Sequence, residues 1–134
     1  HARFADTHAR VGIMPGWGLT VTLPQAVGIR RAKELSATGN FLDAATAHEW
    51  GLVNHLVPHD QLMATALGLA RDIAGNDTRG VRHILATYDA GAAVTAAEAL
   101  ELERSRSREW LRDRAELDLE ARRRAVTERG RSQI

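Results

Sequence analysis

The chain has 134 residues, a net charge of +1 and 44% hydrophobic residues, so it can form one domain with a modest core and is not disordered by composition. The small charge indicates no general attraction to nucleic acid or membrane surfaces, and no run approaches the roughly 18 apolar residues of a membrane-spanning helix. Cysteine is absent, which excludes disulfides and thiolate chemistry, and no secretory signal is visible. We therefore expect a cytoplasmic protein.

The first segment is predicted to be a strand followed by a glycine-containing turn. The strand is expected over Arg3–Thr7, and the turn contains Gly12, Gly16 and Gly18. Glycines let a backbone approach a ligand or another backbone closely. A helix over Leu19–Val27 would direct its free N–H groups at this turn. The pattern is typical of a strand–loop–helix corner that lines a binding site, although a purely structural turn could use the same residues.

Two helices and a second strand are predicted in the middle of the chain. Apolar residues at helical spacing indicate a helix over Ile29–Ala37, and Gly39 is a plausible stop. Asp43 is a good N-cap for a helix over Ala44–Trp50. The apolar segment Leu52–Val57 is typical of a short strand.

The remainder of the chain is predicted to be helical. Periodic apolar positions indicate helices over Gln61–Ala74, Thr78–Ala90, residues 96–107 and Trp110–Arg129. Thr95 and Glu98 have the spacing of a capping box for the third of these. The sequence therefore predicts two short strands and six or seven helices.

The spacing of many residues resembles the second half of the crotonase (enoyl-CoA hydratase/isomerase) superfamily. The matching positions are Phe4, Gly12, Pro15, Gly16, Gly18, Thr20, Leu23, Val27, Gly28, Ala32, Glu34, Thr38, Gly39, Ala47, Gly51, Leu52 and Val53. The resemblance implies a mostly α chain within an α/β parent, namely the C-terminal half of the crotonase spiral fold. It implies that residues 1–75 form the end of the core with an acyl-pocket loop, and that residues 76–134 form a helical oligomerisation and lid region.

The same resemblance implies an activity and its partners. The expected function is that of an enoyl-CoA hydratase, a lyase of fatty acid metabolism that adds water to 2-trans-enoyl-CoA. Its substrate would be an acyl-CoA thioester, with coenzyme A as part of the substrate and no separate cofactor, and its assembly a homotrimer or hexamer. The chain would be a fragment that lacks the N-terminal half, with the oxyanion hole and the first acid–base residue, and would be inactive alone.

Two alternatives stay open at this stage. One is another acyl-CoA reaction of the superfamily, such as double-bond isomerisation, decarboxylation or thioester hydrolysis. The other is a helical oligomerisation module without catalysis.

His8 is the candidate catalytic residue. Counting from Phe4, it occupies the position of the family's second catalytic glutamate. Imidazole can act as an acid or a base near neutral pH, but it is not a carboxylate, so hydration by two glutamates would not apply. A polar histidine at a strand end is the alternative. Asp6 lies on the same strand face if the extended geometry continues, and could orient His8, although the sequence favours a surface aspartate.

Four residues of the turn are the expected substrate-binding residues. By resemblance, Met14, Pro15, Gly16 and Trp17 would shape the acyl pocket. Trp17 stands where most relatives have a small residue, so its ring could shorten the pocket or narrow its mouth. Alternatively, it packs under the C-terminal helices.

The remaining candidates are a possible metal site and a possible phosphate-binding segment, and the sequence supports both less well. His55 and His59 are four residues apart, but Pro58 between them argues against a shared helix face, so we expect no metal site. The arginines from Arg122 to Arg131 could contact coenzyme A phosphates. Interleaved acidic residues instead favour ion pairs along a solvated helix.

Overall fold

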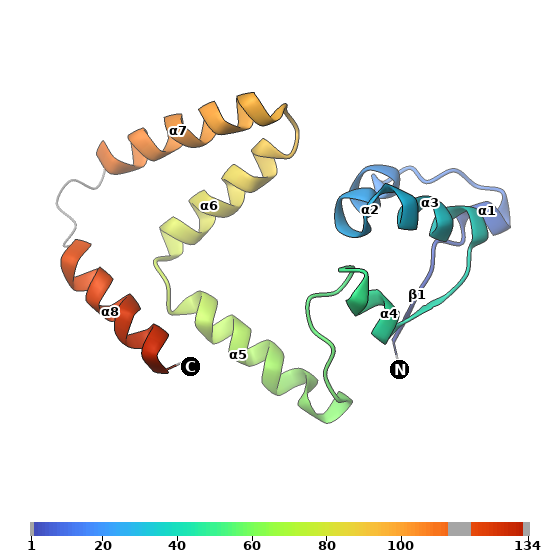
Figure 1. Cartoon of the computed structure of the whole chain (residues 1–134), viewed down its shortest axis with the longest axis horizontal. Coiled ribbons are helices and arrows are strands. Elements are labelled where there is room, and N and C mark those ends of the chain that lie inside the picture. The colour runs from blue at the N-terminus through green and yellow to red at the C-terminus, as the bar shows by residue number, and fades with distance from the viewer. Residues whose placement is uncertain (1, 113–118, 133–134) are drawn as a thin grey trace. The chain divides into compact units, whose positions relative to one another are not determined.

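The computed structural model describes residues 2–112 and 119–132, which divide into two compact units, His1–Gly68 and Leu69–Ile134 (Figure 1). None of the described helices combines the length and apolar character needed to cross a membrane.

The first unit contains a two-stranded antiparallel sheet. Strand β1 (Arg3–Phe4) pairs with β2 (Leu42–Asp43), so that Arg3 lies opposite Asp43 and Phe4 opposite Leu42. The expected strand is therefore cut short, because the backbone turns at Asp6 into helix α1 (His8–Val11). Local side-chain-to-backbone bonds of this kind compete with strand formation.

The expected strand over Leu52–Val57 is wrong. This segment follows the left-handed Gly51, which has a φ of 80°, and contains bends without strand pairing in the described chain. The pairing partner of β1 is instead Leu42–Asp43, immediately before helix α4 (Ala44–Glu49). A short apolar run does not by itself distinguish a strand from a half-buried loop.

The other helices of this unit lie where the sequence predicts them. Helix α2 (Leu19–Val27) packs on α3 (Ile29–Thr38), which ends at the left-handed Gly39. Asp43 accepts a hydrogen bond from the backbone N–H of Thr46 and so caps α4, as expected. The small core consists of Val27, Ala32, Leu35 and Ala47.

A 3₁₀ turn (His59–Gln61) leads into helix α5 (Leu62–Ala74), close to the predicted start at Gln61. In the second unit, helices α6 (Thr78–Gly91) and α7 (Ala96–Arg112) lie side by side as a hairpin (Figure 1). The capping box is confirmed, because Glu98 Oε2 accepts from the Thr95 backbone N at 2.9 Å and from its hydroxyl at 2.7 Å.

The last predicted helix is only partly confirmed. Trp110 belongs to the end of α7, which continues beyond the expected residue 107. Residues 113–118 of the predicted helix lie outside the described residues. Helix α8 (Leu119–Ser132) then carries the arginine-rich end. The described residues contain eight α-helices in all, and the short α1 is the one that had not been predicted.

The arginines of α8 form ion pairs. Arg129 Nη2 lies 2.8 Å from Asp72 Oδ1, and Arg122 Nη1 lies 3.1 Å from Asp77 Oδ2. Asp77 also caps α6 by accepting from the backbone N of Gly80 at 2.9 Å. Both pairs join α8 to acidic residues outside it, whereas the expected pairing along the helix is seen between Arg123 and Glu120, three residues apart.

Candidate active site

The candidate site begins with a direct contact between Asp6 and His8. The Oδ1 atom of Asp6 lies 2.7 Å from Nδ1 of His8 and accepts a hydrogen bond from the His8 backbone N at 3.1 Å. The Asp6 side chain is only 3% exposed, whereas that of His8 is 33% exposed. The interpretation of Asp6 as a surface aspartate is therefore wrong: the turn at Asp6 buries this carboxyl and brings it to the imidazole.

Asp6 is held as a carboxylate by its neighbours. A hydrogen bond from the Ser36 side chain is the largest cause that lowers the pKa of Asp6 below its ordinary value of 3.8. Burial acts in the opposite direction, and the hydrogen bonds and charge of His8 add to the lowering. The group is consequently ionised at neutral pH and acts only as a hydrogen-bond acceptor.

Ser36 is a site residue that the sequence reasoning missed. It lies on α3, one residue after the buried Leu35 and four after the buried Ala32. Residues four apart, such as Ala32 and Ser36, lie on the same face of a helix. A serine on that face needs a hydrogen-bond partner, and this was the signal that could have placed it near the site.

Helix α1 is tied to the end of α3 by a long side chain. Arg10 Nε donates to the carbonyl oxygen of Gly39 at 2.9 Å, and its Nη2 donates to Asn40 Oδ1 at 3.1 Å. The backbone N of Ile13 donates to the carbonyl oxygen of His8 at 3.0 Å. His8 therefore begins a short helix that is held to the end of α3 by Arg10 and closed by the bond from Ile13.

The predicted substrate-binding residues lie in the loop between α1 and α2, directly after the histidine-bearing helix. Its ends are the left-handed Gly12 and Gly18, with φ of 70° and 89°, and Gly18 is the N-cap of α2. The side chains of Met14 and Trp17 are 82% and 98% exposed. Pro15 is half-buried and Gly16 is exposed, with open space where a Cβ would lie. The loop that follows the histidine-bearing helix therefore presents apolar side chains to solvent.

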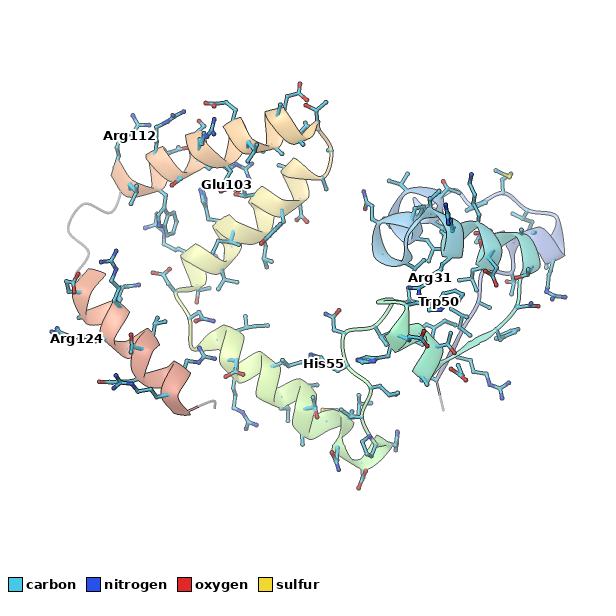
Figure 2. All side chains as sticks on the ribbon, viewed as in Figure 1. Arg31, Trp50, His55, Glu103, Arg112 and Arg124 are labelled. Carbon is cyan, nitrogen blue, oxygen red and sulfur yellow. The ribbon has the colours of Figure 1, made fainter. Side chains whose placement is uncertain are left out.

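Another contact of this unit lies between α3 and the end of α4. The guanidinium carbon of Arg31 lies 5.3 Å from the centre of the Trp50 ring, and both side chains are labelled in Figure 2. Such cation–π contacts contribute roughly 0.5–1 kcal/mol at partly exposed sites. The contact links α3 to the C-cap residue of α4 but supplies no reactive group.

The second unit contains a groove of about 920 Å³ between α6 and α7. Its lining includes His83, whose ring centre lies 5.0 Å from that of Trp110, and Arg106, which donates to the Thr87 hydroxyl at 3.1 Å. Glu103, labelled in Figure 2, also lines it. The groove is mostly apolar, with few polar groups, and resembles a helix-packing surface more than a catalytic centre.

The described residues contain no group of three or more histidine, cysteine, aspartate or glutamate side chains able to hold a metal ion. Within that part of the chain, the pair of Asp6 and His8 is the arrangement best suited to acid–base chemistry. A carboxylate that accepts from one ring nitrogen of a histidine leaves the other nitrogen to exchange protons.

Comparisons with known proteins identify the family of the chain. The profile of the family described as enoyl-CoA hydratase/isomerase matches residues 1–118. A probable peroxisomal enoyl-CoA hydratase of Arabidopsis thaliana is 37% identical over 79% of this chain and 40% of its own length. A 1,2-epoxyphenylacetyl-CoA isomerase of Escherichia coli is 36% identical over 80% of the chain and 41% of its own length.

A crystal structure agrees with these sequence matches. The enoyl-CoA hydratase of Mycobacterium paratuberculosis superimposes with a TM-score of 0.66 at 48% identity, over 80% of this chain and 49% of that one. The chain thus spans about two fifths of the length of the two curated relatives.

Proposed function

The chain belongs to the enoyl-CoA hydratase/isomerase family, and on that premise we propose that the whole protein adds water to a 2-trans-enoyl-CoA to give a 3-hydroxyacyl-CoA. The observation that carries the proposal is the buried Asp6 carboxylate 2.7 Å from the accessible His8 imidazole, followed along the chain by the loop of exposed apolar side chains. Named hydratases among the relatives support the same reaction.

Each part of the site has a proposed role. His8 transfers a proton during the addition of water, and Met14, Pro15, Gly16 and Trp17 contact the acyl chain. Coenzyme A enters as part of the thioester substrate, and the reaction needs no separate cofactor. We further propose a cytoplasmic homotrimer or hexamer that acts in fatty acid metabolism. This assembly would cover the exposed apolar side chains, since large apolar surfaces mark interfaces.

The test is hydration of crotonyl-CoA by the whole protein in water enriched in heavy oxygen. The expected product is 3-hydroxybutyryl-CoA that carries one labelled oxygen, detected by mass spectrometry. The His8→Ala variant should lose turnover by about 100-fold or more, as for other general acid–base residues. Unlabelled product, or full turnover by the variant, would contradict the proposal. The present chain alone should give no turnover, because it spans only part of the relatives' length.

A double-bond isomerase is the second candidate. It is favoured by the imidazole at His8, which can move a proton between two carbons without activating water, and by the family description, which names isomerases beside hydratases. The same labelled experiment, with a 3-enoyl-CoA as substrate, separates the two. An isomerase would give the 2-enoyl thioester without heavy oxygen, whereas a hydratase would incorporate the label.

A further inference from the structure

We propose that Asp6 is a positioning residue for His8, which holds the imidazole in the tautomer with its proton on Nδ1 and leaves Nε2 as the nitrogen that exchanges protons. The inference rests on the proposed function, in which His8 acts as an acid or base. It adds that Nε2 of His8 is the reactive atom and that Asp6 is the residue that fixes the tautomer.

The geometry around Asp6 leaves its carboxylate little freedom. One oxygen, Oδ1, accepts from the His8 backbone N at 3.1 Å and faces Nδ1 of the same residue at 2.7 Å. Rotating the carboxylate away from the ring would therefore also break its bond to the backbone. The side chain is also only 3% exposed, so the surrounding protein further restricts its movement. The carboxylate is thus fixed before any substrate arrives.

The charge state of Asp6 decides the tautomer. An ionised carboxylate has no proton to donate, so a ring nitrogen 2.7 Å away must carry the hydrogen of the contact. If Nδ1 were unprotonated, two acceptors would face each other at that distance, which is repulsive. Neutral His8 therefore carries its proton on Nδ1, and Nε2 has the free lone pair.

Burial separates the tasks of the two side chains. Asp6 is 3% exposed and cannot exchange partners with water, whereas His8 is 33% exposed and can meet a substrate. When Nε2 takes a proton, the ring becomes an imidazolium with a hydrogen on each nitrogen. The nearby carboxylate stabilises this positive charge without itself becoming protonated. The proton is returned from Nε2 when product forms, so the pair ends in its starting state.

The first measurement is made on the unmodified protein, and a variant serves only to assign the signal. Nitrogen NMR of the whole protein, with labelled histidine and His8 assigned by its loss in His8→Ala, reports which ring nitrogen carries the proton. We expect the Nδ1–H tautomer at a pH where His8 is neutral. A clear Nε2–H tautomer would overturn the proposal.

The second measurement compares two variants of the whole protein. Asp6→Asn removes the charge and can present an N–H to Nδ1, so we expect kcat to fall about 100-fold or more, KM to change less, and the tautomer signal to shift. Ser36→Ala keeps the carboxylate beside the ring, so its kcat should fall less than about tenfold. Circular dichroism establishes that each variant is folded.

The outcomes separate this proposal from the proposed function. If His8→Ala keeps full turnover, the catalytic role of His8 fails, whatever Asp6 does. If His8→Ala is inactive but Asp6→Asn keeps the wild-type kcat and tautomer, only the positioning role fails. Equal losses of kcat in Asp6→Asn and Ser36→Ala, with no change of tautomer, would indicate a purely structural role and would also overturn the inference.

Discussion

Arg10 Nε donates a hydrogen bond to the carbonyl oxygen of Gly39 at 2.9 Å and thereby joins helix α1 to the end of α3. Gly39 is buried and has a φ of 60°, the left-handed conformation that ends α3. The side chain of Arg10 passes directly over this glycine, because a Cβ built on Gly39 would lie 2.7 Å from Arg10 Cγ. The position of the helix that starts at His8 therefore depends on the absence of a side chain at residue 39.

We predict that Gly39→Ala lowers the free energy of unfolding by about 2 kcal/mol. The left-handed conformation costs a residue with a Cβ about 1–2 kcal/mol, and the methyl group would also displace Arg10 from its hydrogen bond. Urea denaturation of the whole protein at fixed concentration measures the change. Wild-type stability would contradict the prediction.

The matched control is Gly68→Ala. Gly68 lies within helix α5, and a Cβ there would meet nothing within 4 Å. Alanine is favoured over glycine in a helix by about 1 kcal/mol. This variant should therefore be as stable as the wild type or more so, and the two glycine substitutions should have opposite signs.

The sequence predicted most of the helices well because these have local signals of their own. Asp43 and the pair Thr95 and Glu98 are caps, and Gly39 is a helix stop, and all three occur as predicted. The second strand was misplaced because strand pairing depends on a distant partner, and the Leu42–Asp43 segment has no alternating pattern of its own.

The candidate site was predicted only in part. His8 and the loop residues could be named because they occupy positions of a known pattern, and the structure places His8 at the start of the short helix that precedes that loop. The burial of Asp6 and its bond from Ser36 depend on how the chain turns after Phe4 and on where α3 packs. Neither feature can be inferred from local residue spacing. The expectation of an extended strand over Arg3–Thr7 therefore placed Asp6 wrongly at the surface.

The carboxyl of Asp6 should make stability depend on pH in the acid range. Its pKa is lowered by the Ser36 hydrogen bond and by His8, from an ordinary value of 3.8. At a pH between the lowered folded-state pKa and the ordinary value, the unfolded chain binds more protons than the folded one. Stability therefore rises with pH in this range. The contribution is fully present above the ordinary value and is lost as the pH falls through the folded-state pKa.

Denaturation of the whole protein at a series of pH values down to about pH 3 checks this. The difference in unfolding free energy between wild type and Asp6→Asn should shrink on acidification. In Ser36→Ala the largest cause of the lowered pKa is gone, so its acid dependence should be weaker than that of the wild type. A difference that stays constant with pH would show that the Asp6 carboxyl is not linked to folding.

Trp17 should limit the acyl chain that the whole protein accepts. Its side chain is 98% exposed in the loop after Gly16, so it is available to a ligand and contributes little to folding. We predict that Trp17→Ala raises kcat/KM for a long-chain enoyl-CoA relative to crotonyl-CoA about tenfold. This corresponds to about two more buried methylenes at roughly 0.8 kcal/mol each.

Steady-state kinetics with a series of enoyl-CoA substrates measures this change in specificity. Trp17→Phe should give an intermediate ratio, because its ring is smaller. Met63→Ala is the control, since Met63 is an exposed apolar residue of α5, 67% exposed, outside the loop. An unchanged ratio in Trp17→Ala would exclude Trp17 as a wall of the acyl pocket.

The chain expressed alone should self-associate. Few apolar residues of the described part are buried, and two of these are alanines. By contrast, Met14 is 82% exposed, Trp17 98% and Tyr88 73%. Apolar surface of this extent normally lies in an interface. Sedimentation over a range of concentrations should show species larger than a monomer and strong binding of a hydrophobic dye. A monomer at all concentrations would contradict this.

The ion pair between Arg129 and Asp72 should contribute little to stability, although it joins α8 to the end of α5. The two side chains are 40% and 59% exposed, with 2.8 Å between Nη2 and Oδ1. Water and salt screen such a contact, and ordering two long side chains costs entropy. We expect a double-mutant cycle of Arg129→Ala and Asp72→Ala, read by denaturation of the whole protein, to give a coupling of about 0.2–1 kcal/mol.

The coupling should fall as salt is raised, because the Debye length shortens from about 10 Å at 0.1 M to about 3 Å at 1 M. The pair Arg123 and Glu120, three residues apart on α8 and 76% exposed on both sides, is the matched control, with a coupling at or below the lower end of that range. A salt-independent coupling well above 1 kcal/mol for Arg129 and Asp72 would mean that this end of α8 is shielded from solvent in the whole protein. The arginine-rich helix would then be part of a buried interface rather than a solvated face.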